Sequence, residues 1–349
     1  MYTREFQESR PSPIDKGVPL FGTWTGAFQG VDLLDIQNPY RFPSPRWIRD
    51  LRIKEWETFI IQDERFLMEA LFSNLKVYRM AQILLYDKTS GKKLQFIKTI
   101  PLSGWQLPKG LANAAVDSHS WVFFFRIHDW LDADTIKLDL NIEASSKRPS
   151  FTAHAEFDVS AQKTGAMSVC LPFSGRRCMY AFKTLAAVRG DLVFGGEHYF
   201  LDPGKTSGIF GDFKGFFPYR MRANWCNGFG LDEKGRRFGF SLAENQTREA
   251  YKNNENVLWL DDGLSLLPPV KITMPGGIGS DWIIQDMEGM VDLVFSPKEA
   301  VRNSRNLLFI NSEYITPLGY YNGVLVSSGG EEIQVKNLWS TGEQLYLRI

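Results

Sequence analysis

Residues 135–159, TIKLDLNIE-ASSKRPS-FTAHAEFDV, contain two runs of alternating apolar and polar side chains around a turn-rich connector. A period of two residues is typical of a β-strand with one buried face and one solvated face. The Ser and Pro residues of the connector favour a chain reversal. We therefore predict an antiparallel hairpin. Its apolar face is expected to comprise Ile136, Leu138, Leu140, Ile142, Phe151, Ala153, Ala155, Phe157 and Val159.

Strand-like runs recur on both sides of this hairpin, including 56–61, 65–72, 78–86, 236–242, 291–295 and 319–326. Gly- and Ser-rich turn signals separate them, and no rhythm of strands alternating with long helices is present. Helical signals are confined to two short segments, 108–116 and 297–305, each opened by a Pro. The sequence thus predicts an all-β fold, with two lipocalin-like antiparallel β-barrels or bent sandwiches packed together.

A chain of 349 residues is long enough for two domains. The segment 172–177, PFSGRR, interrupts the strand pattern near the middle of the chain and is a plausible crossing point. We predict an N-terminal barrel-like domain over residues 1–185 and a C-terminal barrel-like domain over residues 186–349.

The overall composition excludes several classes of protein. Forty Lys and Arg balance forty Asp and Glu, so no net field favours nucleic acid as a partner. Three cysteines without CxxC spacing, and four histidines without ligand spacing, predict no disulfide framework and no metal. No motif for phosphate or dinucleotide binding is present, so we expect no cofactor. The aromatic share of 14% predicts a large core or an apolar cavity.

The chain also lacks targeting signals that we could recognise. No apolar run reaches the roughly 18 residues of a membrane-spanning helix. The first residues, MYTREFQESRPSPIDKG, carry no apolar segment of the kind found in signal peptides. We therefore expect a cytoplasmic protein with no membrane span. The sequence gives no indication of the oligomeric state.

Residues 208–263 combine polar, aromatic and glycine residues at unusual density, beginning GIFGDFKGFFPYRMRANWCNGFG. If these strands line a barrel mouth, Asp212 is a candidate acid, and other polar side chains are candidate ligand contacts. The alternative is structural: Asp212 caps a turn and Arg220 pairs with a carboxylate such as Glu255 at a domain interface. The candidate ligand-binding residues are Tyr219, Arg220, Asn224, Trp225, Asn245, Glu255 and Asn256.

Two further residues are candidates for catalysis. In GEQLYLR, strand alternation places Glu343 on the same face as Leu345 and Leu347, and burial there would raise the pKa of this carboxyl. Glu343 is therefore a candidate general acid, unless the strand end twists it into solvent or an arginine pairs with it. His198 shares the parity of Leu192 within LVFGGEHYF, although Gly195 and Gly196 can reverse its orientation through a bulge.

The order of several motifs resembles an uncharacterised bacterial family, the domain of unknown function 2804. The motifs are GTWTG, KEWETF, GDFKGFFPYRMRANWCNG, RRFGFSLAEN, NENVLWLDDG, DWIIQDMEGMVDLVFSP, GYYNG and GEQLYLR, which together span nearly the whole chain. This family is distantly similar to two-barrel, lipocalin-like (calycin) proteins that include carotenoid hydratases and tocopherol cyclases. The resemblance implies the fold, and by analogy alone a lipophilic substrate.

Three functions therefore remain open from the sequence. The first is binding of a lipophilic small molecule, of isoprenoid, polyene or acyl type, in a barrel pocket. The second is a cofactor-free hydratase, cyclase or isomerase in which Asp212 or Glu343 protonates such a molecule. The third is a structural or interaction protein whose polar cluster only joins two barrels. A carboxyl at the wall of a closed apolar cavity would distinguish the enzyme from the other two.

Overall fold

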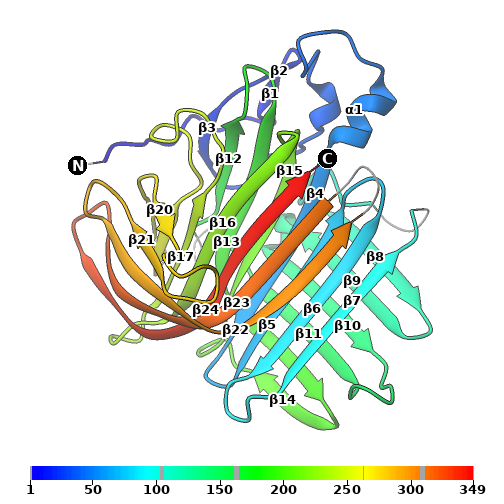
Figure 1. Ribbon diagram of the computed structural model, residues 1–349, viewed down its shortest axis with the longest axis vertical. Helices are drawn as coiled ribbons and strands as arrows, with labels where there is room; N and C mark the ends of the chain where they lie inside the picture. Colours follow the sequence, from blue (N-terminus) through cyan, green and yellow to red (C-terminus); the bar gives the residue numbers. More distant parts are fainter. Residues whose placement is uncertain (1, 103–105, 161–164, 262, 307–310, 349) are drawn as a thin grey trace.

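The structure, a computed structural model, describes residues 2–102, 106–160, 165–261, 263–306 and 311–348. In these ranges nearly all the regular structure is antiparallel β-sheet (Figure 1). Two large curled sheets pack against each other, and we call them the first sheet and the second sheet. The prediction of an all-β fold with two packed barrel-like units is confirmed.

The first sheet contains thirteen strands, and ten of them form one continuous path. In spatial order this path is β7 (Lys93–Ile100), β6 (Arg79–Asp87), β5 (Phe66–Asn74), β4 (Lys54–Gln62), β15 (Ser207–Gly215), β13 (Cys178–Phe194), β11 (Phe151–Asp158), β10 (Thr135–Ile142), β9 (Phe123–Trp130) and β8 (Ala114–Ser120). Three strands lie off the path: β12 (Met167–Pro172) and β14 (Glu197–Leu201) pair with β13, and β3 (Gly22–Thr25) pairs with β12. The rings of Phe96 and Phe123, 4.9 Å apart, bring β7 close to β9 and curl the sheet on itself.

The second sheet contains nine strands. In spatial order they are β19 (Gly263–Leu266), β18 (Val257–Leu260), β17 (Arg237–Glu244), β16 (Arg220–Leu231), β24 (Glu332–Arg348), β23 (Asn311–Val326), β22 (Val291–Asn306), β21 (Trp282–Gln285) and β20 (Lys271–Thr273). The remaining elements are short: β1 (Ile14–Asp15), β2 (Val18–Pro19), the helix α1 (Arg46–Arg52) and two 3-10 turns, Leu33–Asp35 and Leu131–Ala133.

The predicted hairpin is present as β10 and β11, with Ile142 paired to Phe151 and Thr135 paired to Asp158. Burial alternates along both strands, because one face packs into the sheet interior and the other meets water. Strands β4, β5 and β15 behave differently, because almost every residue in them is buried. These three strands are covered on both faces. One face of each strand meets the interior of the first sheet, and the other meets the space between the two sheets.

Three large apolar cores follow from this arrangement, and a small fourth cluster contains Leu71, Met80 and Tyr314. The first fills the concave interior of the first sheet and includes Phe59, Phe72 and Phe125. The second fills the space between the two sheets. The third lies in the concave interior of the second sheet, around Trp282 and Tyr321. At about 25 cal/mol for each square ångström of buried apolar surface, aromatic residues of this size account for much of the folding free energy.

The two predicted short helices are wrong. Residues 297–305 lie within β22, where the pairing with β23 shifts register between Pro297 and Glu299. A proline is tolerated in a strand at such a bulge, because no ladder hydrogen bond is lost there. Residues 114–116 form the start of β8, and the residues just before them are irregular. Pro297 therefore marks a bulge within a strand, and Pro108 lies in a loop.

Chain connectivity places the transition between the two sheets in residues 216–219, after β15 and before β16. The expected boundary at residue 185 falls inside β13, which pairs with β12 and β15 over its first half and with β11 and β14 over its second half. The division into domains 1–185 and 186–349 stays a prediction. Within the described ranges, no helix combines the length and apolarity needed to cross a bilayer.

Candidate functional site

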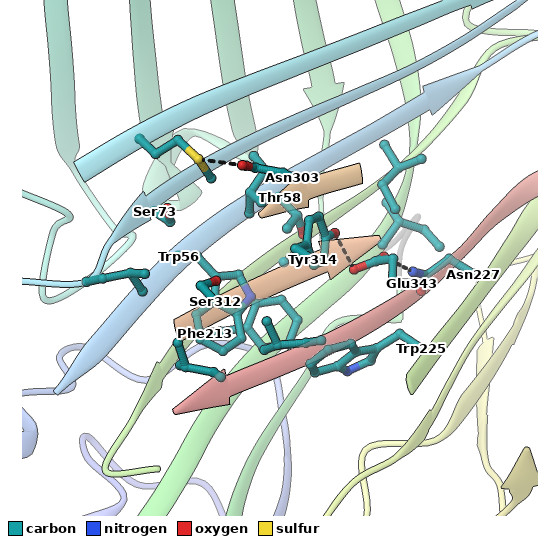
Figure 2. A pocket seen from close by; sticks show the side chains of 18 of the residues that line it. Trp56, Thr58, Ser73, Phe213, Trp225, Asn227, Asn303, Ser312, Tyr314 and Glu343 are labelled. Carbon is teal, nitrogen blue, oxygen red and sulfur yellow. Dashed lines mark hydrogen bonds between the residues drawn. The ribbon is translucent and has the colours of Figure 1, made fainter. Parts of the chain in front are cut away.

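A cavity lies between the two sheets, and both sheets contribute side chains to its wall (Figure 2). It contains about 830 Å³ of space not filled by atoms, part of which is continuous with solvent. Most of the wall is apolar, and Trp56, Phe213 and Trp225 present aromatic rings to it.

Strand alternation explains which side chains reach this cavity. On β4, Trp56, Thr58 and Ile60 line the cavity, whereas Phe59 and Ile61 join the core inside the first sheet. The second sheet contributes in the same way from β24, whose residues Glu343, Leu345 and Leu347 all line the cavity. These three residues share one face, as the alternation in the sequence predicts.

Glu343 is held at the cavity wall by two hydrogen-bond donors. The Asn227 side chain donates to Oε1 and the Tyr314 hydroxyl donates to Oε2, each at 2.7 Å (Figure 2). The Tyr314 hydroxyl also lies 3.1 Å from Oε1 of Glu69, a carboxyl that is 1% exposed. Tyr314 thus connects two buried carboxyls, one from each sheet.

A phenol carries one proton and can donate to only one of these carboxyls. The second contact is a hydrogen bond only if the other carboxyl is protonated and donates to the phenol oxygen. Burial, and after it the charge of Glu343, raises the pKa of Glu69 to about 8. Burial also raises the pKa of Glu343, while Tyr314, Lys183 and Asn227 oppose this rise. The raised pKa values favour a proton retained by the pair, and the Tyr314 hydroxyl bridges the two carboxyls.

A buried ion pair lies beside this carboxyl pair. Lys183, on β13, places its Nζ 2.6 Å from Oε2 of Glu255, and both side chains are 2% exposed or less. The same ammonium donates to the Ser241 hydroxyl at 2.9 Å. Glu255 also accepts from Asn245 at 2.8 Å and from the Trp225 indole at 3.3 Å. Lys183, Ser241 and Trp225 line the cavity, whereas Glu255 is not among the lining residues. The ion pair therefore meets the cavity through Lys183.

We call the following set the cavity cluster: Glu69, Lys183, Asn227, Glu255, Tyr314 and Glu343. It contains three carboxyls and one ammonium in two groups, Asn227–Glu343–Tyr314–Glu69 and Lys183–Glu255. Lys183, Asn227, Tyr314 and Glu343 line the cavity. No group of three or more His, Cys, Asp or Glu side chains suited to a metal ion occurs in the residues that the structure describes. The chemistry that the cluster can perform on its own is proton transfer.

Asp212 lies on the opposite face of β15 from the cavity. It is 1% exposed and forms an ion pair with Lys214 at 2.9 Å. Glu57 on β4 is paired with Asp212 across the sheet. Burial, and after it neighbouring carboxylates that include Asp212, raises the pKa of both Glu57 and Asp129. We call Glu57, Asp129, Asp212 and Lys214 the barrel cluster. Asp212 does not line the cavity, and it does not contact Glu343 in the described structure.

The structure brings together only part of the predicted ligand set. Trp225, Asn245 and Glu255 meet around Lys183. Glu255 pairs with Lys183, and Arg220 is exposed at the start of β16. Tyr219 is also exposed and contributes nothing to the cavity wall.

The remaining candidates have other partners. Asn224 points away from the cavity and accepts a hydrogen bond from Gln344 at 3.2 Å. Asn256 is fully buried and bonds two backbone groups, the Ala243 amide at 2.7 Å and the Pro268 carbonyl at 2.8 Å. His198 lies on β14 at the surface, 3.2 Å from Asp191.

Sequence reasoning missed Lys183, Tyr314 and Glu69. A signal for two of them was available, because a single charged residue interrupts the apolar runs CMYAFKTLAA and FLMEALF. Charged side chains are rarely fully buried unless they are paired, so an isolated one in such a run marks a buried polar contact. Tyr314 carried no comparable signal.

The fold places the chain among all-β proteins built from two curled antiparallel sheets packed together. It belongs to the family described as a domain of unknown function (DUF2804), whose sequence profile matches residues 21–348. Among solved structures it is similar to kievitone hydratase from Nectria haematococca, with 14% identity and a TM-score of 0.46 over 84% of this chain and 88% of that chain. No curated protein matches the sequence.

Proposed function

We propose that the protein is an enzyme that transfers a proton to or from a carbon atom of an apolar small molecule. The observation that carries this proposal is the Glu69–Tyr314–Glu343 chain, which ends at the wall of an apolar cavity. A carrier needs a cavity of suitable shape, but it does not need a buried carboxyl with a raised pKa at that wall. A structural protein whose polar residues only join two sheets needs neither the cavity nor the buried carboxyl.

The proposed reaction is cofactor-free hydration, cyclisation or isomerisation of a carbon–carbon double bond. Glu343 in its acid form gives its proton to one alkene carbon, so a C–H bond forms and the π bond breaks. The neighbouring carbon becomes a cation. This cation is quenched by water or by loss of an adjacent proton, either at once or after a second double bond has attacked it and shifted the charge, and the proton released by water or by the substrate returns to the Glu343 carboxylate.

Tyr314 and Glu69 would maintain Glu343 in its acid form. Before the first turnover, the Tyr314 proton moves to a Glu343 carboxylate while the Glu69 proton moves to the phenol oxygen, so Glu343 enters the reaction as the acid and Glu69 as the carboxylate. The pKa of about 8 for Glu69 makes this second carboxyl a proton store at neutral pH.

The cavity wall fits an unsaturated, apolar substrate of isoprenoid, polyene or acyl type. Trp56 and Phe213 are stacked, with ring centroids 5.3 Å apart, and both line the cavity with Trp225. Aromatic faces attract a cation by roughly 0.5 to 2 kcal/mol each, which would favour the cationic intermediate. The positive charge of Lys183, which would otherwise repel such a cation, is offset by Glu255.

Solvent deuterium provides the test. The protein is incubated in D₂O with polyenes, isoprenoids and unsaturated acyl compounds, and products are examined by mass spectrometry and NMR. We expect one deuterium bonded to carbon for each turnover. Glu343→Gln should abolish this incorporation and leave the circular dichroism spectrum unchanged. Unchanged turnover in Glu343→Gln would disprove the role of this residue.

A second candidate function is binding without chemistry, as a carrier or sensor of a lipophilic molecule. The predominantly apolar wall of the cavity favours it. Native mass spectrometry of the purified protein, followed by organic extraction, distinguishes the two functions. A tightly held compound that is recovered unchanged after incubation in D₂O would support the carrier, whereas a recovered product labelled on carbon would support the enzyme.

A further inference from the structure

The entrance of the cavity can be located from the exposure of its wall. Among the residues that line it, only Trp56, Tyr78 and Leu345 are partly exposed, and the other lining residues are buried. These three lie at one end of the sheets, near the start of β4, the turn between β5 and β6, and the end of β24. Solvent, and any ligand, therefore reaches the cavity past these three side chains.

The helix α1 lies beside this entrance. Trp56 follows the last residue of α1 by only four positions. The Lys76 ammonium, in the turn that carries Tyr78, forms an ion pair with Asp50 of α1 at 3.1 Å. Figure 1 shows α1 projecting beyond the sheets at the end where β24 finishes and β4 begins. The helix therefore forms part of the rim of the entrance.

This rim exposes several large apolar side chains to solvent. Trp47 is 65% exposed and Phe42 is 60% exposed, and α1 buries none of its residues. A short helix without a buried face gains little from packing, so its apolar residues have no role inside the fold. We call the following set the α1 patch: Phe42, Trp47, Ile48, Leu51 and Val77, each at least 36% exposed.

The segment that carries most of the α1 patch has an excess of positive charge. Residues 41–52, RFPSPRWIRDLR, contain four arginines and one aspartate, an excess of three positive charges in a chain with no net charge. Arg49 donates to the backbone carbonyls of Leu34 and Ile36, and Arg52 donates to the Tyr40 hydroxyl. Because these acceptors are neutral, they do not offset the positive charges of Arg49 and Arg52. The charge of Arg46 is partly offset by Asp32, 3.7 Å away.

We propose that the α1 patch docks on the surface of an anionic phospholipid membrane. Exposed Trp, Phe and Leu among arginines is the composition of segments that lie in the headgroup region of a bilayer. The arginines supply attraction to anionic headgroups, and the apolar side chains enter the boundary of the acyl chains. Docking in this orientation would place the entrance against the membrane, where apolar molecules are concentrated.

The test is flotation of the full chain with vesicles of phosphatidylcholine, with and without phosphatidylglycerol. We expect binding to the anionic vesicles that weakens as salt is raised. Trp47→Glu should lower the partition coefficient at least roughly tenfold, because a large apolar side chain leaves the interface and a negative charge enters it. The matched control is Trp121→Glu, since Trp121 is 99% exposed in a turn between β8 and β9, outside the α1 patch.

The outcomes separate this proposal from its competitors. Absence of binding to both vesicle types overturns it, as does an equal loss in Trp47→Glu and Trp121→Glu. Self-association in size-exclusion chromatography that Trp47→Glu abolishes, without vesicle binding, would replace the membrane by a second copy of the chain. The proposal does not rest on the proposed chemistry, because flotation requires no substrate and Glu343→Gln should float like the wild-type protein.

Discussion

The barrel cluster lies on strands β4, β9 and β15 of the first sheet, on the face opposite the cavity, whereas the cavity cluster lies where the two sheets meet. Both are buried and both contain three carboxyls and a single lysine. They differ in hydrogen bonding: Tyr314 and Asn227 organise Glu343, whereas all four oxygens of Glu57 and Asp129 lack a hydrogen bond to the described protein atoms. The cavity cluster borders the cavity, whose described wall includes none of the four barrel-cluster residues. The comparison indicates that burial of charge alone does not define a site, and that organised donors beside a cavity do.

The most direct test of this difference replaces one carboxyl in each cluster by its amide. Glu343→Gln is expected to lower turnover by roughly 10²- to 10⁴-fold, the usual contribution of a general acid. Asp212→Asn should change turnover by less than roughly threefold, because Asp212 faces away from the cavity. Deuterium incorporation from D₂O measures both. A larger loss in Asp212→Asn than in Glu343→Gln would reverse the two assignments.

The barrel cluster should instead affect stability. Lys214→Met removes the ammonium that is 2.9 Å from Asp212 and leaves the buried carboxyls without it, which is expected to cost about 3 to 5 kcal/mol of unfolding free energy. Urea denaturation at neutral pH measures this loss. The double variant with Asp212→Asn should recover part of it. A loss below about 1 kcal/mol would contradict the ion pair as an important contact.

The pH dependence of the unfolding free energy tests the protonation of the cavity cluster. The pKa of Glu69 is about 8 in the folded protein and near 4.5 in the unfolded chain, so the folded state binds more protons between these values. Stability contributed by this group is complete below pH 4.5 and is lost as pH rises towards 8, by up to about 1.4 kcal/mol for each pH unit.

Glu69→Gln should therefore flatten the stability profile across this window, as measured by urea unfolding at several pH values. Asp191→Asn serves as the control, because Asp191 lies at the surface beside His198. An identical slope in Glu69→Gln and wild type would show that Glu69 is not protonated in the folded state.

The smallest effect is expected outside both clusters. His198 lies at the surface, 47% exposed, and contacts neither the cavity nor the barrel cluster. His198→Ala should change unfolding free energy by less than about 0.5 kcal/mol and leave turnover unchanged. A tenfold fall in turnover with this variant would mean that the chemistry occurs at β14, and the cavity would lose its assignment.

Much of the fold was predictable, because alternation reports the burial of one face. The hairpin of β10 and β11 and the inward face of Glu343 both follow from a period of two residues. This signal disappears in β15, where all nine residues from Ser207 to Gly215 are buried. A strand covered on both faces has no polar side, so the sequence could not indicate which face of β15 carries Asp212.

The assembly of the site was less predictable, because it depends on pairing between distant segments. Glu69 comes from β5, Lys183 from β13 and Tyr314 from β23, and no local pattern relates the three strands. Side chains from opposite sheets meet only after the sheets pack. Their contacts therefore depend on tertiary geometry, to which a single sequence without homologues gives little access.

The position of Glu343 on β24 also has a consequence for biosynthesis. Its partner Asn227 precedes it by 116 residues, and β24 joins β16 to β23 as the last described strand to leave the ribosome. Until then, the edges of β16 and β23 that β24 will cover are unpaired and can recruit other strands. A nascent chain that stalls before residue 332 could complete the first sheet but would lack the acid. It would present an open edge that chaperones must protect.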